Sequence, residues 1–227
     1  MNKPKKFFTI PFTTVHPNAV LNLVIQRRLG AEGGEDYSTF ASVAQFANSV
    51  PEKLRLAGGF IIPVYHPESV ILEFKSPSGY PFAVKASMDD NCLLTGRLKT
   101  YGLSHGQCRT ENGVRDFQNY LSTSLNTRLD RGYTGNGRFD YFFGHYPPLT
   151  IELEIYPFKS DRWPPAQDVQ SLKPINVDGY DLPVLVDTRK ASDYDQNTLS
   201  RIRLHLVTMD QWEAITGKPI EYPPLTK

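Results

Sequence analysis

The sequence has few cysteines and no long apolar run, and each shortage excludes a class of protein. Only Cys92 and Cys108 occur among its 227 residues. Two cysteines are too few for the disulfide framework of a small secreted module, and no CxxC pair indicates zinc or redox chemistry. We expect two reduced, partly buried thiols, with a single bridge left open if the compartment is oxidising.

No stretch approaches the roughly 18–20 apolar residues that are needed to cross a bilayer. The apolar run after the basic N-terminus is broken by Pro11, Thr13 and Thr14. It is shorter than the apolar core of a secretory signal, which spans about 7–15 residues. The sequence therefore predicts a soluble, cytoplasmic protein that does not insert into a membrane.

An excess of charge of one sign is also lacking. The 25 basic residues nearly balance the 24 acidic ones, and the formal net charge is +1. Proteins dedicated to nucleic acid or to anionic membranes usually carry a clear basic excess. The five histidines are far apart and show no metal-binding spacing such as HExxH. We therefore expect no dedicated nucleic-acid binding, no metal site and no cofactor.

Proline and glycine are plentiful, with 18 and 16 residues, and they divide the chain into short pieces typical of strands and turns. Residues 149–156 and 201–207 alternate apolar and polar side chains, which predicts strands with one buried face. Residues 70–75 and 80–86 flank a Ser-Pro-Ser-Gly turn and predict a hairpin. Two apolar runs, 60–64 and 182–186, predict more interior strands.

Helical signals are fewer. Residues 38–48 place apolar side chains on one stripe, with Ser38 as the N-cap and Pro51 as a stop. Residues 208–217 begin with a capping box and end at Gly217, which suits a left-handed C-terminal position.

Together the patterns predict a mainly β fold, sandwich-like or α+β with an antiparallel sheet, and two to three short helices. No alternating βαβ pattern indicates a doubly wound sheet. We expect a single domain over residues 1–227, with a surface connection or sub-boundary around 160–174.

The Ser-Thr-Ser at 122–124, followed by Glu152-x-Glu154, resembles the STS…ExE pattern of the clostridial-type ADP-ribosyltransferases. The resemblance implies NAD as a substrate. Glu154 would stabilise the positive charge that develops as the glycosidic bond breaks, and Glu152 would position the acceptor. Ser122 would brace the site.

The same resemblance assigns the phosphates of NAD to Arg97 or Arg109. Another interpretation stays open, because apolar residues between Phe117 and Leu129 fall at steps of three and four. This spacing predicts an amphipathic helix with the serines on its polar face, although a strand between 115 and 131 is not excluded. The two glutamates would then be the exposed face of an ordinary strand.

A second motif, Glu73-x-Lys75 at the end of an apolar strand, resembles the second half of the PD-(D/E)xK nuclease motif. The resemblance implies a Mg²⁺ ion and an attacking water held by the two side chains. Alternation places Glu73 and Lys75 on one strand face. The additional acid is missing, because the nearby Glu68 lies in a predicted turn, and the pair is also typical of a solvated face.

A third candidate is the segment around LDRGYTGNGRFDYFFGHY. Its glycines allow backbone N–H groups to approach an anion, and arginines with aromatics can bind a phosphate or stack on a sugar. The predicted ligand-binding residues are Arg128, Arg131, Tyr133, Arg138 and Tyr141. The alternative is a glycine-rich turn that leads into an aromatic strand of the core.

Each catalytic motif lacks a required member or has an ordinary structural explanation. We therefore expect a non-catalytic β-rich binding or structural module, which could be a subunit of a larger assembly. Tyr, Phe, Trp and Arg are enriched at interfaces, which favours a protein partner or self-association. A small anionic or sugar ligand is a further expectation. ADP-ribosyl transfer is the alternative, and a metal-dependent nuclease stands third.

Overall fold

The computed structural model describes residues 7–29, 35–37, 39–110, 113–123, 127–129, 131–133, 139–143, 148–164, 175–177, 180–182 and 189–226. Only the backbone is described at residues 36, 106–110, 113–117, 131–133, 139–141, 143, 175–177 and 180–182. The described chain is mainly β, as predicted, and contains two α-helices and three short 3-10 helices.

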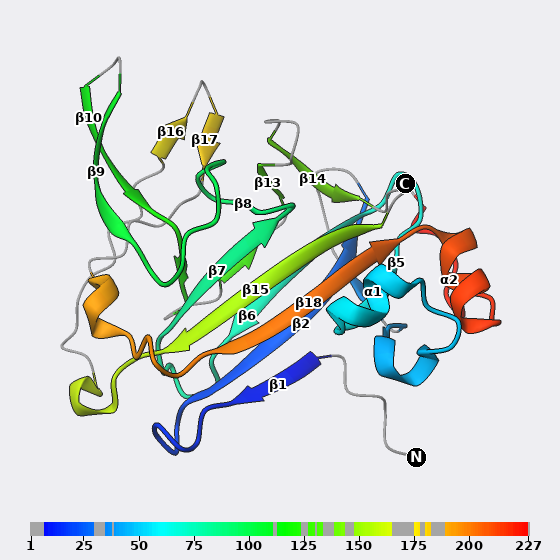
Figure 1. Ribbon diagram of the computed structural model, residues 1–227, viewed down its shortest axis with the longest axis horizontal. Coiled ribbons are helices and arrows are strands. Elements are labelled where there is room, and N and C mark those ends of the chain that lie inside the picture. Colours follow the sequence, from blue (N-terminus) through cyan, green and yellow to red (C-terminus); the bar gives the residue numbers. More distant parts are fainter. Residues whose placement is uncertain are drawn as a thin grey trace.

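Two seven-stranded sheets form the body of the molecule (Figure 1). Sheet A has the order β1 (Phe7–Pro11), β2 (Val20–Arg28), β6 (Ser69–Lys75), β14 (Phe139–Phe143) and β13 (Arg131–Tyr133), with β12 (Thr127–Leu129) paired to β6 and β3 (Glu35–Asp36) paired to β2. All of these pairs are antiparallel.

Sheet B has the order β11 (Leu121–Ser122), β7 (Phe82–Met88), β15 (Leu149–Pro157), β18 (Ser200–Val207), β5 (Phe60–Pro63) and β4 (Ala41–Ser42), with β8 (Asn91–Cys92) paired to β7. Its pairs are antiparallel except for β18 with β5, which run parallel. Two separate hairpins complete the strands: β9 (His105–Thr110) with β10 (Gly113–Gln118), and β16 (Ile175–Val177) with β17 (Tyr180–Leu182).

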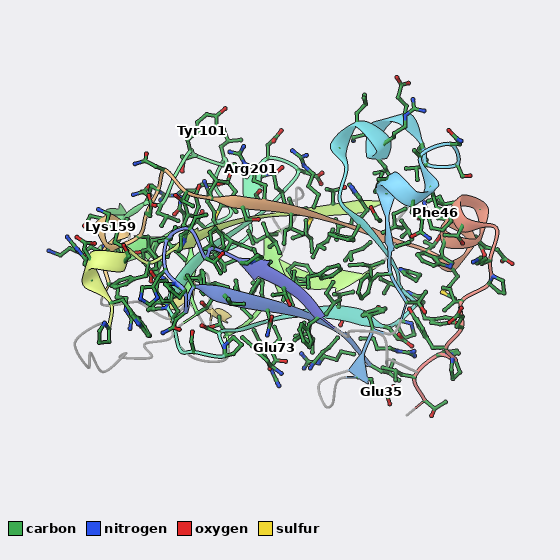
Figure 2. All side chains as sticks on the ribbon, turned by 90° about the horizontal axis from the view of Figure 1, so that it is seen from below. Glu35, Phe46, Glu73, Tyr101, Lys159 and Arg201 are labelled. Carbon is green, nitrogen blue, oxygen red and sulfur yellow. The ribbon has the colours of Figure 1, made fainter. Side chains whose placement is uncertain are left out.

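The two sheets lie face to face and share one hydrophobic core (Figure 2). Leu23 and Leu72 of sheet A and Leu153 and Leu204 of sheet B are all fully buried in it. Every second residue of β15 (Ile151, Leu153, Ile155) and of β18 (Leu204, Leu206) belongs to this core, so the period-two patterns predicted at 149–156 and 201–207 are confirmed. Burying a leucine side chain contributes about 1.5–3 kcal/mol, so the shared core accounts for much of the stability.

Two of the 3-10 helices, η2 (Ser160–Arg162) and η3 (Ala191–Asp193), lie at one end of sheet B (Figure 1). The other three helices lie at the opposite end, where β18 finishes; they are η1 (Val43–Phe46), α1 (Glu52–Ala57) and α2 (Met209–Thr216). A second, smaller core joins them to the outer face of β5 and β18; it contains Ala41, Val43, Val50, Leu54, Ile61, Val207, Trp212 and Ile215. The helices are therefore seated on the sheet by their own apolar contacts.

The predicted helix at 208–217 is confirmed in detail. Thr208 and Gln211 form the reciprocal capping box, and Gly217 ends the helix with φ 65°. The prediction at 38–48 is wrong in its extent: residues 41–42 form β4 and only 43–46 form a 3-10 turn. The N-cap is Ser42, and Pro51 does not stop a helix but precedes α1, where proline suits the helix start.

The predicted hairpin of 70–75 with 80–86 is also wrong, although both strands exist. β6 pairs within sheet A and β7 pairs within sheet B, so the Ser-Pro-Ser-Gly turn carries the chain from one sheet to the other. Both strands are buried along nearly their whole length. The side chains on both faces of each strand are therefore covered. Strands that follow each other in the sequence need not pair when they belong to different sheets of the sandwich.

An amphipathic helix over 117–129 does not form. Residues 113–118, 121–122 and 127–129 are strands instead, and Leu121 pairs with Val84 while Leu129 pairs with Leu72. The poor helix propensity of the serines and threonines, together with sheet pairing, outweighs the apolar spacing. The strand at 60–63 is confirmed, whereas of 182–186 only Leu182 lies within the described residues, at the end of β17.

The end of the chain is fastened by a buried ion pair. Arg27 on β2 and Glu68 lie 2.7 Å apart, and their side chains are 4% and 1% exposed. Arg27 also donates to the carbonyl of Pro223, and Glu68 accepts from the backbone N–H of Leu225, each at 2.6 Å. Residues 223–225 are thereby held against the sandwich.

Three further predictions concerned the cysteines, the connection at 160–174 and membrane insertion. Cys92 is a free, buried thiol, while the side chain of Cys108 is not described. The predicted connection at 160–174 starts with η2 (Ser160–Arg162), and residues 165–174 lie outside the described residues. Among the described helices, none has the length and apolar character that a membrane span requires.

Candidate functional site

The charged side chains of sheet B lie on the face turned away from sheet A. Across β7, β15 and β18, Lys85, Glu154 and Arg201 stand directly opposite one another. The next row on this outer face is formed by Ser87, Glu152 and Arg203. Oppositely charged residues that face each other across neighbouring strands attract, so the register itself assembles the network.

Glu154 is not the exposed residue that strand alternation predicts. Its side chain is 2% exposed, and its carboxylate lies 3.5 Å from Nζ of Lys85 and 3.2 Å from Nε of Arg201. The hydroxyl of Tyr156 donates to it at 3.0 Å. Burial, together with the charge of Glu154, raises the pKa of Tyr156, so the phenol stays protonated as the donor.

The segment 93–104 covers this part of the outer face. Lys85, 1% exposed at its side chain, donates to the backbone carbonyls of Thr100 and Gly102 as well as pairing with Glu154. Breaking one partner out of a buried pair leaves an uncompensated charge. The pair keeps Lys85 charged and in place, and the hydrogen bonds from Lys85 to Thr100 and Gly102 hold the covering segment to the sheet.

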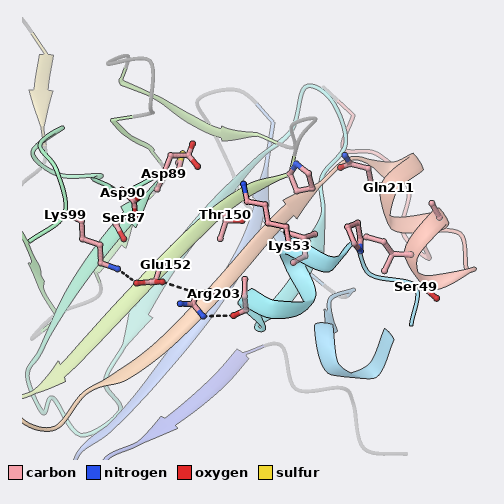
Figure 3. Close-up of a pocket in the computed structure, with 17 residues that line it drawn as sticks. Ser49, Lys53, Ser87, Asp89, Asp90, Lys99, Thr150, Glu152, Arg203 and Gln211 are labelled. Atoms are coloured by element: carbon pink, nitrogen blue, oxygen red, sulfur yellow. Dashed lines mark hydrogen bonds and ion pairs between the residues drawn. The ribbon is translucent and has the colours of Figure 1, made fainter. Parts of the chain in front are cut away.

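Glu152 occupies a more open position beside the covering segment. It forms ion pairs with Lys99 and, at 2.9 Å, with Nε of Arg203 (Figure 3). Partial burial alone would raise the pKa of Glu152, but the hydrogen bonds and charges of Lys99 and Arg203 outweigh it and lower that pKa. Glu152 is therefore a fixed carboxylate at neutral pH. Arg203 also donates to the carbonyl of Ala57 and so connects α1 to the outer face of sheet B.

His205, the next residue on the outer face of β18, is fully buried and does not line the pocket itself. Its Nε2 lies 2.6 Å from the carbonyl of Gly58, which can only accept, so Nε2 carries the proton and Nδ1 accepts from Thr150 Oγ1 at 2.9 Å. Burial, aided by Arg203, lowers the pKa of His205 despite the bond to Gly58. The imidazole is thus neutral and bonded at both nitrogens.

A pocket of about 600 Å³ lies between the outer face of sheet B and the two α-helices (Figure 3). Lys99, Glu152 and Arg203 form its floor. Its apolar lining comprises Pro51, Leu54, Ala57, Met88, Pro148, Ala214 and Ile215. Its charged lining comprises Lys53, Lys99, Arg203, Asp89, Asp90 and Glu152. The volume lies within the range of about 300–1,000 Å³ that is usual for ligand pockets.

The pocket is bounded on one side by a strained turn. Asp89 and Asp90, which join β7 to β8, have φ of 47° and 62°. Two consecutive residues with positive φ are the geometry of a type I′ hairpin, which usually takes Asn-Gly. Aspartates at both positions place two exposed carboxylates at the pocket rim at some cost in backbone energy.

The structure places the residues of the STS…ExE resemblance as follows. Ser122, opposite Ala83, lies on the same outer face as Glu154, with β7 between their strands. Its hydroxyl is 3.0 Å from that of Tyr194, and Arg189 lies at 3.5 Å. In the described chain no hydrogen bond or ion pair joins Ser122 to Glu154, whose carboxylate is held by cations of the outer face of sheet B.

Of the two arginines assigned to NAD phosphates, Arg97 is exposed in the covering segment, and the side chain of Arg109 is not described. Among the residues of this resemblance whose side chains are described, Glu152 alone lines the pocket.

The nuclease-like residues lie on the opposite side of the molecule, on the outer face of sheet A (Figure 2). Lys75 is 2.8 Å from Glu73, and Gln26 and Arg128 also bond to this carboxylate, at 3.1 and 3.4 Å. Glu73 is therefore surrounded by donors. Within the described residues, no group of three side chains of the metal-binding types comes together.

Of the predicted Arg–aromatic site, Arg128 is described in full and its side chain is 63% exposed, next to Glu73. The backbone pairs Arg131 with Tyr141 and Tyr133 with Phe139 across β13 and β14, but these side chains are not described. Arg138 lies outside the described residues. The expected aromatic strand forms, and its Phe142 is fully buried in the core.

The pocket was not predicted from the sequence. Lys53, Ser87 and Lys99 carry no local motif, and they meet only because separate elements converge. One signal was available: Asp89-Asp90-Asn91 after an apolar run is a turn composition that could have marked the β7–β8 hairpin.

Comparisons with known proteins add no assignment: no family model matches the chain, and no curated protein or solved structure is significantly similar to it. The function is therefore inferred from the geometry of this site.

Proposed function

We propose that this chain is a non-catalytic binding module and that a protein partner docks on the outer face of sheet B, around the 600 Å³ pocket. The observation that carries the proposal is the state of the pocket floor. Lys99 and Arg203 both pair with Glu152, so each of these charged groups already has a partner within the chain, and the three together keep one excess positive charge. Such a floor is a stable surface for recognition.

Glu152 in the pocket floor and His205 beside it are poorly suited to proton transfer. General acid–base catalysis needs a group that is free to reach the substrate, with a pKa near the working pH. Glu152 is held ionised by two cations, and the lowered pKa of His205 together with its two hydrogen bonds keeps that ring neutral. These contacts favour binding over turnover.

Exposed apolar side chains on the elements beside the pocket support a protein partner. Four large hydrophobic side chains of the described residues are exposed, and three of them, Leu56, Leu98 and Tyr101, belong to α1 and the covering segment. Tyr101 is 96% exposed and lies on the sheet B side of the molecule (Figure 2). Apolar and aromatic residues around a pocket are typical of interface cores.

The test is partner capture from a native extract with the purified full chain and two variants. Ala214→Trp fills the pocket from an exposed position of α2, and Glu213→Trp adds the same side chain at a neighbouring position that does not line it. We expect wild type and Glu213→Trp to retain the same partner and Ala214→Trp to lose it. Equal capture by all three proteins, or catalytic turnover by the pure chain, would overturn the proposal.

A further inference from the structure

We propose further that the partner inserts a short segment in which a lysine or arginine lies next to a large apolar residue. This inference rests on the proposed function and names the chemistry of the partner. It follows from the charges that remain unpaired at the pocket, from its apolar wall, and from one serine hydroxyl in its lining that has no partner in the described chain.

The unpaired charges are unevenly distributed. In the floor, Lys99 and Arg203 share Glu152 as their partner, so one excess positive charge remains there. Asp89 and Asp90 form no ion pair with the described part of the chain, and both are exposed at the β7–β8 turn. Two adjacent carboxylates therefore attract a cation at this side of the pocket, and they disfavour a polyanion such as nucleic acid.

The opposite side of the pocket sets a limit on the cationic charge. Lys53 extends from α1 over β15 towards Thr150 (Figure 3). It forms no ion pair within the described residues, so it repels a second cation and suits an acidic residue of the incoming segment. The recognised segment is thus dipolar rather than uniformly basic.

The apolar lining explains why the cation should be a long side chain beside an apolar one. Lysine and arginine bury their aliphatic stems against apolar surface while the charged head stays at a polar rim. Pro148 and Ile215 are part of that lining, and the acidic turn lies at its edge. A neighbouring large apolar residue would fill the remaining volume between the helices.

Ser87 supplies an independent polar contact. Its residue is 4% exposed, it lies on the outer face of β7 in the pocket lining, and its hydroxyl forms no hydrogen bond with the described chain. The residue is largely buried and its hydroxyl is open to the pocket, where a backbone amide or carbonyl of a bound segment can form a hydrogen bond with it. A peptide offers such groups at every residue.

The experiment selects peptides from a phage-displayed library of random dodecapeptides on the wild-type full chain. We expect enriched sequences with one lysine or arginine beside a large apolar residue. A synthetic peptide of that kind is then titrated by fluorescence anisotropy. Asp89→Asn/Asp90→Asn should weaken its binding roughly 10- to 100-fold, the loss of one or two charge-assisted hydrogen bonds. Asparagine tolerates positive φ, so this variant should fold.

Glu213→Gln, which removes an exposed charge of α2 outside the pocket, is the matched control and should bind like wild type. Peptides that lose binding to Ala214→Trp but lack a cation would overturn this inference and leave the proposed function intact. Peptides that bind Ala214→Trp as well as wild type would overturn both. A selection without enrichment would reject the peptide class, while partner capture decides the proposed function separately.

Discussion

Replacing Glu154 by glutamine should destabilise the protein, because the residue is a structural anchor. Its carboxylate is 2% exposed and contacts Lys85, Arg201 and the hydroxyl of Tyr156. Removing one partner of a buried ion pair costs about 3–5 kcal/mol. Glutamine keeps the volume and can still accept from Tyr156, so we expect a loss of about 3 kcal/mol. At about 2–4 °C per kcal/mol, the unfolding midpoint should fall by roughly 6–12 °C.

The assay is thermal unfolding followed by circular dichroism, with two comparison variants. Lys85→Met/Glu154→Leu removes both charges and should recover part of the loss, because no buried charge is left uncompensated. Glu213→Gln changes an exposed carboxylate and should leave the midpoint unchanged.

A Glu154→Gln protein as stable as wild type would refute the structural role of this carboxylate. If that stable variant had also lost an NAD-cleaving activity of the wild type, the ADP-ribosyltransferase interpretation would replace the binding proposal.

Three other predictions concern pH, backbone and the chain end. The folded-state pKa of His205 lies below its ordinary 6.5, so the contribution of the neutral ring to the free energy of unfolding is complete above about pH 6.5 and is lost as the pH falls. Urea unfolding between pH 7.5 and 5.5 should show that the free energy of unfolding falls by up to about 1.4 kcal/mol per pH unit, and His205→Gln should lack this slope. Gly58→Ala has open space around the new Cβ, but φ 69° with ψ −168° is a conformation nearly restricted to glycine, so it should cost about 1–3 kcal/mol by thermal unfolding. Gly59→Ala should cost more than Gly58→Ala, because φ is 98° and its new Cβ would also meet the backbone of β18. Arg27→Met should cost about 3–5 kcal/mol, because it leaves Glu68 buried without its cation. Limited proteolysis should then cleave around residues 223–225 faster than in wild type, and an unchanged cleavage rate would contradict the role of the Arg27–Glu68 pair in holding this segment.

Local periodicity predicted the fold class, and the residues show why. Strands β15 and β18 bury every second side chain in one core, so their alternation is visible in the sequence. The helix ending at Gly217 has a complete capping signature. The hairpin prediction failed at β6 and β7, since a turn composition does not say whether the next strand joins the same sheet or the other one.

The candidate site was less accessible to sequence reasoning for the same physical reason. Glu152 and Glu154 were recognised as chemically suggestive, but their partners Lys85 and Arg203 are set by strand register. Burial of Glu154 depends on the covering segment, which the alternation of β15 cannot reveal. The pocket itself requires α1 and α2 to be seated on sheet B by a second core. Non-local packing of this kind leaves no local motif.

The most direct test of the binding proposal is amide hydrogen exchange of the full chain, measured with and without the captured partner. We predict that binding slows exchange in three separate segments, around residues 49–57, 87–90 and 211–215, which line the pocket from α1, the β7–β8 turn and α2. Protection confined to the outer face of sheet A, around Glu73 and Arg128, would contradict the account and move the binding site to the other side of the sandwich.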